Sequence, residues 1–140
     1  RKTVAPGKAC GELTGGNLSL VASAVGTPYA MDAKDKIVFL EDVGERPYPE
    51  DGMLNHLVQS GALSGCRGIV LGYYTDCNPP KDKPSLTLDE VFDELLAPLG
   101  VPVLSGVTCG HSTPTLSLPI GCDAELDADA QTLRIVEGEK

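Results

Sequence analysis

Two side chains of the sequence have the types and settings that acid–base chemistry needs. Glu41 directly follows the β-rich run 36–40, apolar after Lys36, which predicts a buried strand that ends at a carboxylate. In open α/β sheets, functional groups gather beyond the carboxyl ends of strands. His111 lies in the small-residue segment 108–114, and imidazole is the usual general base near neutral pH. Together they would form two thirds of a nucleophilic triad, in which the histidine takes a proton and the carboxylate orients it.

The third member of such a triad is not recognisable in the chain. The motif G-x-S-x-G, which puts a serine on a sharp strand-to-helix turn, is absent. Ser112 has Gly110 before it, but Pro114 replaces the second glycine and no helical pattern follows. We therefore expect the nucleophile outside this chain. The simpler alternatives are that Glu41 is a solvated loop carboxylate and that His111 only bonds to backbone.

A candidate binding site comes from Gly15, Gly16 and Asn17. The glycines predict a tight turn where backbone approaches another group closely. Asn17 is a good N-cap for a helix over 18–25, with apolar residues at helical spacing. Amide donors at such a helix start can bind a substrate carboxylate. A plain capping role explains Asn17 equally well. The other histidine, His56, is interpreted as a partly exposed scaffold residue of a helix.

The cysteines do not indicate a disulfide framework or a metal site. Their number is odd and no C-x-x-C pair occurs, which predicts reduced thiols that act as small buried hydrophobes. The zinc alternative, Cys109 and His111 with Cys122, lacks the paired spacing of zinc ligands. We expect neither a metal nor a cofactor. The five cysteines are Cys10, Cys66, Cys77, Cys109 and Cys122.

The elements that position these residues alternate in type and predict an α/β fold with a mixed sheet. Helices are expected over 18–25, from a cap at Asp51 to Gly61, and from a capping box at 87–90 to Pro98. The last third predicts a C-terminal antiparallel hairpin with its turn at 127–130. Strands are expected over 36–40, 68–74, 101–106 (with Pro102 at an edge or at the strand entry), 116–118, 124–126 and 132–136.

Composition limits the partners. The 140 residues form one domain, and 11 basic against 20 acidic side chains give a net charge of -9. This balance disfavours nucleic acid and anionic membrane surfaces as partners, and no apolar run approaches the roughly 20 residues of a membrane span.

The opening residues lack a methionine and a signal peptide. Residues 1–12 are interpreted as a linker from a missing N-terminal half, with tag removal or processing of the mature end as alternatives.

Six segments together resemble the C-terminal half of the LD-carboxypeptidases, the serine peptidases also called muramoyltetrapeptide carboxypeptidases. The likeness covers nearly the whole chain in order and implies a swivelling β/α-type domain over residues 13–140. One departure is visible: the family usually has an Asp-Arg pair after Pro-Tyr, whereas this chain has Asp51-Gly52, which puts fine specificity in doubt. The segments are 15–20, 26–29, 39–45 with Pro47-Tyr48, 100–103, 110–111 and 118–121.

The resemblance implies a division of roles. The N-terminal half of such proteins carries the nucleophilic serine, so Glu41 would be the triad carboxylate and His111 the general base, and this chain alone would be inactive. The implied substrate is a cytoplasmic murein tetrapeptide that loses its terminal D-alanine during peptidoglycan recycling, and the implied assembly is a homodimer. Two alternatives stay open: an amidase of the microcin C immunity type, and a non-catalytic dimerisation or ligand-binding module.

Overall fold

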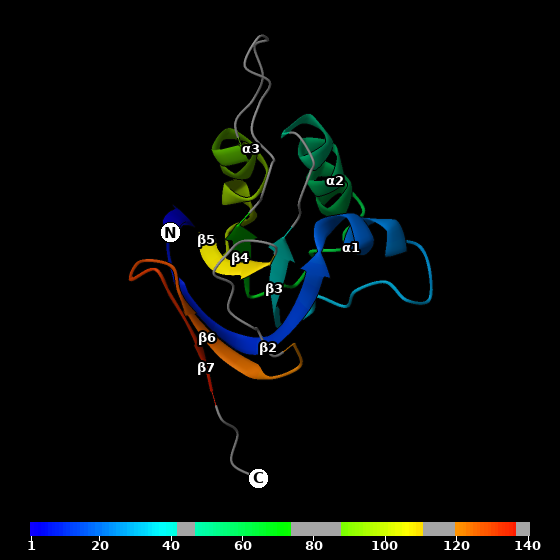
Figure 1. The fold of residues 1–140 in the computed structure, drawn as a ribbon. Helices are drawn as coiled ribbons and strands as arrows, with labels where there is room; N and C mark the ends of the chain where they lie inside the picture. The colour runs from blue at the N-terminus through cyan, green and yellow to red at the C-terminus, as the bar shows by residue number, and fades with distance from the viewer. Residues whose placement is uncertain (42–46, 74–87, 111–119, 137–140) are drawn as a thin grey trace.

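The computed structural model describes residues 1–41, 47–73, 88–110 and 120–136. Within them, the strands form a single seven-stranded sheet in the order β1-β5-β4-β3-β2-β6-β7 (Figure 1). In chain order the elements are β1 (Lys2–Ala5), β2 (Lys8–Asn17), α1 (Leu18–Ala24), β3 (Lys36–Glu41), α2 (Pro47–Gln59), β4 (Gly68–Tyr73), α3 (Leu88–Leu95), a 3-10 turn (Ala97–Leu99), β5 (Val103–Gly110), β6 (Asp123–Asp127) and β7 (Thr132–Ile135).

The four central strands are parallel. β2 pairs with β3, β3 with β4, and β4 with β5, all in the same direction. β1 and the β6–β7 hairpin flank them in antiparallel pairing. The α/β class, the mixed sheet and the C-terminal hairpin predicted from the sequence are therefore confirmed. Because parallel strands end at the same edge, the residues that close β2, β3 and β5 share one side of the sheet.

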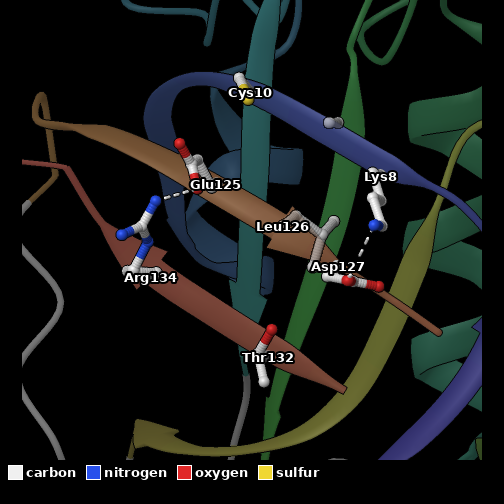
Figure 2. Close-up of a pocket in the computed structure, with 8 residues that line it drawn as sticks. Lys8, Cys10, Glu125, Leu126, Asp127, Thr132 and Arg134 are labelled. Carbon is white, nitrogen blue, oxygen red and sulfur yellow. Dashed lines mark hydrogen bonds and ion pairs between the residues drawn. The ribbon is translucent and has the colours of Figure 1, made fainter. Parts of the chain in front are cut away.

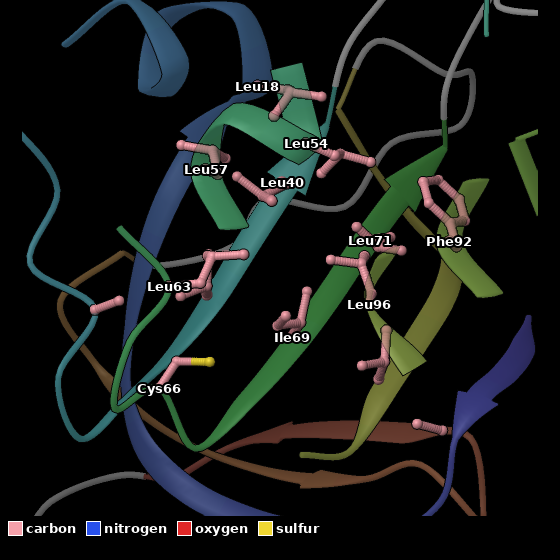
Figure 3. Packing of buried hydrophobic residues seen from close by; sticks show 14 of the residues in the cluster. Leu18, Leu40, Leu54, Leu57, Leu63, Cys66, Ile69, Leu71, Phe92 and Leu96 are labelled. Atoms are coloured by element: carbon pink, nitrogen blue, oxygen red, sulfur yellow. The ribbon is translucent and has the colours of Figure 1, made fainter. Parts of the chain in front are cut away.

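The helices cover one face of the sheet and enclose the larger core (Figure 3). The four residues between the charged ends of β3 are all apolar because both faces of the strand are covered: Val38 and Leu40 face the helices, while Ile37 and Phe39 face the opposite side. A strand buried on both faces cannot alternate with polar residues. The helices contribute, among others, Leu18 from α1, Leu54 and Leu57 from α2, and Phe92 from α3.

The sheet curls, and this curl builds a second core on the face away from the helices. Figure 1 shows β2 bending beneath the central strands, with β6 and β7 following it. Ala124 and Leu126 of β6 thereby pack against Ile37 and Val70. The fit is close at Gly68, where a Cβ would lie 2.8 Å from the Leu126 side chain.

Residues 1–12, predicted to be a linker, instead form β1 and the first half of β2. β1 pairs with β5, and it is also bonded to the turn of the β6–β7 hairpin. The Thr3 hydroxyl donates to the Ala128 carbonyl, and the Ala128 N–H donates to the Gly7 carbonyl at 2.9 Å. These partners lie more than a hundred residues away, so local composition did not reveal them.

Three predicted boundaries were wrong. α2 begins at Pro47 rather than after Asp51, in keeping with the preference of proline for the first helical position. α3 ends at Leu95, and Pro98 lies in the following 3-10 turn. β5 begins at Val103, two residues later than predicted, and continues to Gly110 instead of ending at Gly106. The strand expected over 116–118 and the first residue of the box at 87–90 lie outside the described residues.

The hairpin turn has a pH-sensitive contact. Asp127 Oδ1 accepts a hydrogen bond from the Ala130 N–H at 3.0 Å, and this bond, with help from Lys8, lowers the pKa of Asp127. A carboxylate with a lowered pKa stabilises the fold above its unfolded-state pKa, and this stabilisation is lost as the pH falls through the folded-state value. We expect Asp127→Ala to lower the urea midpoint at pH 7, and the difference from wild type to vanish in strong acid. Asp129→Ala, at an exposed neighbour, should leave the midpoint unchanged at both pH values.

Candidate active site

Glu41 is the buried carboxylate of the candidate site. It closes β3, and only 6% of its surface is exposed. A glutamate is rarely buried to this degree without a partner. The side-chain amide of Asn17 supplies one, since its Nδ2 donates to Glu41 Oε1 at 3.5 Å. The two residues stand opposite each other in the β2–β3 register, as the last residues of neighbouring parallel strands.

Asn17 also caps α1, as predicted. Its backbone is extended, and its Oδ1 accepts a hydrogen bond from the Leu20 N–H at 3.2 Å. With the oxygen directed to the helix, the nitrogen of the same amide is directed to Glu41. The capping interaction therefore orients the donor that holds the carboxylate. The sequence pointed to the cap, but the contact with Glu41 depends on strand register.

These two roles of Asn17 can be separated by substitution. Asn17→Ala should destabilise the chain by about 1 kcal/mol, because the cap is lost. Asn17→Ser keeps a capping oxygen and should stay within a few tenths of a kcal/mol of wild type. In the enzyme proposed below, both variants should lose about tenfold in kcat, since a hydrogen bond to a charged group contributes about 1.5 kcal/mol. Thermal unfolding and steady-state kinetics measure the two effects, and full activity of Asn17→Ser would contradict the role assigned to the amide.

Gly15 and Gly16 precede Asn17 at the end of β2, with φ of 113° and 146°. They lie in a strand and not in the predicted tight turn, but the predicted close approach of backbone is confirmed. A Cβ on Gly15 would stand 2.0 Å from the Phe39 carbonyl oxygen, so only glycine lets β2 and β3 come this close. Beside this stretch opens a pocket of about 390 Å³, lined by Thr14, Gly15, Gly16, Asn17, Leu20, Val21, Ala24, Tyr29 and Met31.

The predicted base, His111, lies outside the described residues. Its neighbour Gly110 is the last residue of β5 and stands opposite Tyr73 of β4. Since β4 separates β5 from β3, the ends of β3 and β5 are two strand spacings apart, roughly 10 Å. The register shifts of β5 near Gly106, which has a φ of 78°, mark irregular pairing before this end. His56, by contrast, is exposed on α2, in agreement with the helical and at least partly exposed position predicted for it.

The prediction of buried cysteines holds for Cys66 and was wrong for Cys10 and Cys122, which are exposed. All three are free thiols, and the other two cysteine side chains are not among those described. Among the described residues, no cluster of three or more His, Cys, Asp or Glu is arranged to hold a metal ion.

The thiols should differ in reactivity. Burial raises the pKa of the Cys66 thiol, which lowers both its thiolate fraction and its access to reagents. We expect iodoacetamide at pH 8 to modify Cys10 and Cys122 at least about tenfold faster than Cys66. Peptide mapping by mass spectrometry over time checks this, with the urea-unfolded chain as the control in which the three rates converge.

A second pocket, of about 510 Å³, lies at the opposite end of β2 (Figure 2). Its charges pair across the strands: Lys8 with Asp127 at 3.6 Å, and Arg134 with Glu125. Its cations are thus paired with carboxylates of the same surface. The pocket is separate from the edge that holds Glu41, and we assign the candidate site to that edge.

The α/β domain with a buried glutamate at its strand edge matches the family model described as the LD-carboxypeptidase C-terminal domain, over residues 10–126. The chain belongs to this family. It is 41% identical over 133 residues to the probable murein peptide carboxypeptidase of Bacillus subtilis (strain 168), a match that covers 95% of this chain and 42% of that protein. This chain thus spans about two fifths of the length of the curated relatives it matches.

Solved structures agree with this assignment. The muramoyltetrapeptide carboxypeptidase from Oxalobacter formigenes superposes with a TM-score of 0.84 at 30% identity, covering 96% of this chain and 47% of that one. The microcin C7 self-immunity protein MccF, in complex with aspartyl sulfamoyl adenosine, gives a TM-score of 0.83 at 26% identity, covering 98% of this chain and 41% of that one. No helix among the described residues is long and apolar enough to cross a membrane.

Proposed function

We propose that this chain is the C-terminal half of a serine LD-carboxypeptidase that releases terminal D-alanine from murein tetrapeptides. One observation carries the proposal: a buried glutamate, held by an amide from the neighbouring strand, ends β3 at the same sheet edge where β5 ends one residue before His111. The names of the relatives support the substrate class. The setting would be the cytoplasm, in peptidoglycan recycling, with the enzyme as a homodimer.

The proposed mechanism divides the work between two halves of a longer parent protein. A serine of the N-terminal half attacks the amide carbonyl while His111 takes its proton. Glu41 holds the correct imidazole tautomer and stabilises the imidazolium. His111 then protonates the departing D-alanine, and water hydrolyses the acyl-enzyme. Gly15, Gly16 and Asn17 border the substrate in this proposal, because they lie beside Glu41 and line the adjoining pocket.

The position of the strand ends supports this pairing of Glu41 and His111. β3 ends at Glu41 and β5 ends at Gly110, one residue before His111, and these two strand ends lie at one edge of the sheet, roughly 10 Å apart. The amide of Asn17 donates to one oxygen of the Glu41 carboxylate and so orients the side chain that this proposal pairs with the imidazole.

The direct test is an assay of D-alanine release from purified murein tetrapeptide. The parent protein should release D-alanine, and these 140 residues alone should not. Release by this chain at the rate of the parent would contradict the split triad. Absence of release by the parent would contradict the proposed reaction and leave the amidase described next or a non-catalytic module.

The likeness to MccF favours a second candidate, an amidase that acts on peptidyl-nucleotide antibiotics of the microcin C type. The same Glu41–His111 pair would serve it, because the bond cleaved is again an amide. Parallel assays with murein tetrapeptide and with an aminoacyl-nucleotide amide separate the two. The carboxypeptidase proposal expects the larger kcat/KM for the tetrapeptide.

A further inference from the structure

An uncharged surface lies next to the candidate site. Residues 13–31 contain no Asp, Glu, Lys, Arg or His, although the chain as a whole carries a net charge of -9. The segment comprises the end of β2, all of α1 and most of the loop that leads to β3 (Figure 1).

The same segment exposes large apolar side chains. Tyr29 is 88% exposed and Leu20 is 72% exposed, and they are two of the three exposed large hydrophobic residues among those described. α1 already buries Leu18 against the sheet, and Leu20 adds apolar surface on the side of the helix that faces solvent, beside Ala24 in the same pocket. Apolar patches of this kind mark interaction sites.

The uncharged surface of residues 13–31 adjoins the sheet edge that holds Glu41. Leu20 and Tyr29 line the same pocket as Gly15, Gly16 and Asn17, and Asn17 contacts Glu41. Any group that brings a nucleophile to Glu41 and His111 must come to this edge of the sheet. The body that carries it then lies over, or directly beside, α1.

We propose that the docking face, formed by Leu20, Val21, Ala24, Tyr29 and Met31, packs against the serine-bearing half of the parent protein. This inference rests on the function proposed above. Two observations favour that occupant over a second copy: the relatives extend well beyond the region that this chain matches, and the face adjoins the edge where the serine must arrive. The lack of charge on the face indicates an interface with either occupant. Interface cores are depleted of charged residues, since burying unpaired charge is costly.

Hydrogen–deuterium exchange tests the docking face without measuring catalysis. Amides of residues 18–29 should exchange at least about tenfold more slowly in the parent protein than in this chain alone, and the slowing should not depend on protein concentration. Leu20→Asp with Tyr29→Asp should abolish the slowing in the parent. Thr132→Asp, which adds a charge at an exposed position of β7, should preserve it, and far-UV circular dichroism checks that each variant is folded.

Two results would overturn the inference. Equal amide exchange rates of residues 18–29 in the parent and in the isolated chain would mean that the docking face stays exposed to solvent in the parent protein. Slowing that grows with concentration, together with a dimer in light scattering that the Leu20→Asp/Tyr29→Asp variant loses, would assign the face to a second copy. The catalytic proposal stands or falls separately, because a His111→Ala parent should retain the protected face while losing D-alanine release.

Discussion

The Glu41→Gln substitution is expected to lower kcat for D-alanine release by the parent protein about 10⁴-fold, and His111→Ala is expected to lower it about 10⁶-fold. The first change removes the charge that orients and stabilises the imidazole, although Asn17 still has an oxygen to bond. The second removes the base that takes the proton of the serine. Because residues of a triad act as a unit, the double variant should be little worse than His111→Ala alone.

Matched controls exist within the chain. His56→Ala removes the exposed histidine of α2, and Glu12→Gln neutralises an exposed glutamate of β2, so both should leave kcat within about twofold of wild type. Steady-state kinetics with murein tetrapeptide measure all the variants. Wild-type turnover by His111→Ala would contradict the assignment of His111 as the base. A decrease of kcat in His56→Ala as large as that in His111→Ala would contradict the choice of His111 over His56.

Gly15→Ala is expected to give the largest change in stability, about 3–5 kcal/mol. The added Cβ would stand 2.0 Å from the Phe39 carbonyl oxygen, a backbone atom that cannot rotate away, at a φ of 113°. β2 must then separate from β3, which also parts Asn17 from Glu41. Urea unfolding of this chain measures the loss of free energy, and the parent variant should lose activity as well.

Gly26→Ala is the control variant, because it introduces backbone strain without a steric clash of the added Cβ. Gly26 has a φ of 85°, but an added Cβ meets no atom within 4 Å. This variant should lose only about 1–2 kcal/mol, the cost of the left-handed conformation. Equal losses at the two glycines would show that the close approach of β2 to β3 adds nothing to the requirement for glycine.

Local pattern predicted the parts of the fold whose causes are local. The continuous apolar run of β3 is typical of a strand covered on both faces, and Asn17 before an apolar segment marks a helix start. The curl of the sheet depends instead on contacts between Leu126 of β6 and the central strands. The strand formed by residues 2–5 likewise depends on β5 and on the hairpin turn, which no window of neighbouring residues contains.

The same distinction applies to the site. Glu41 was predicted as a candidate functional residue because functional groups gather beyond the carboxyl ends of strands in open α/β sheets. Its burial and its bond to Asn17 follow from the parallel register of β2 and β3, which sets Asn17 opposite Glu41. The exposure of Leu20 and Tyr29 was not predicted: Leu20 lies outside the apolar face expected for the helix over 18–25, and Tyr29 lies beyond that helix.

The bond between Thr3 and Ala128 joins residues 125 positions apart in the chain. During synthesis on the ribosome, β1 therefore emerges long before its partners in the hairpin turn exist. Until β6 leaves the exit tunnel, Ile37, Phe39 and Val70 lack the cover that Leu126 gives them. The nascent domain passes through a state with one finished core and one bare apolar sheet face, and in this interval it is most prone to aggregate or to need a chaperone.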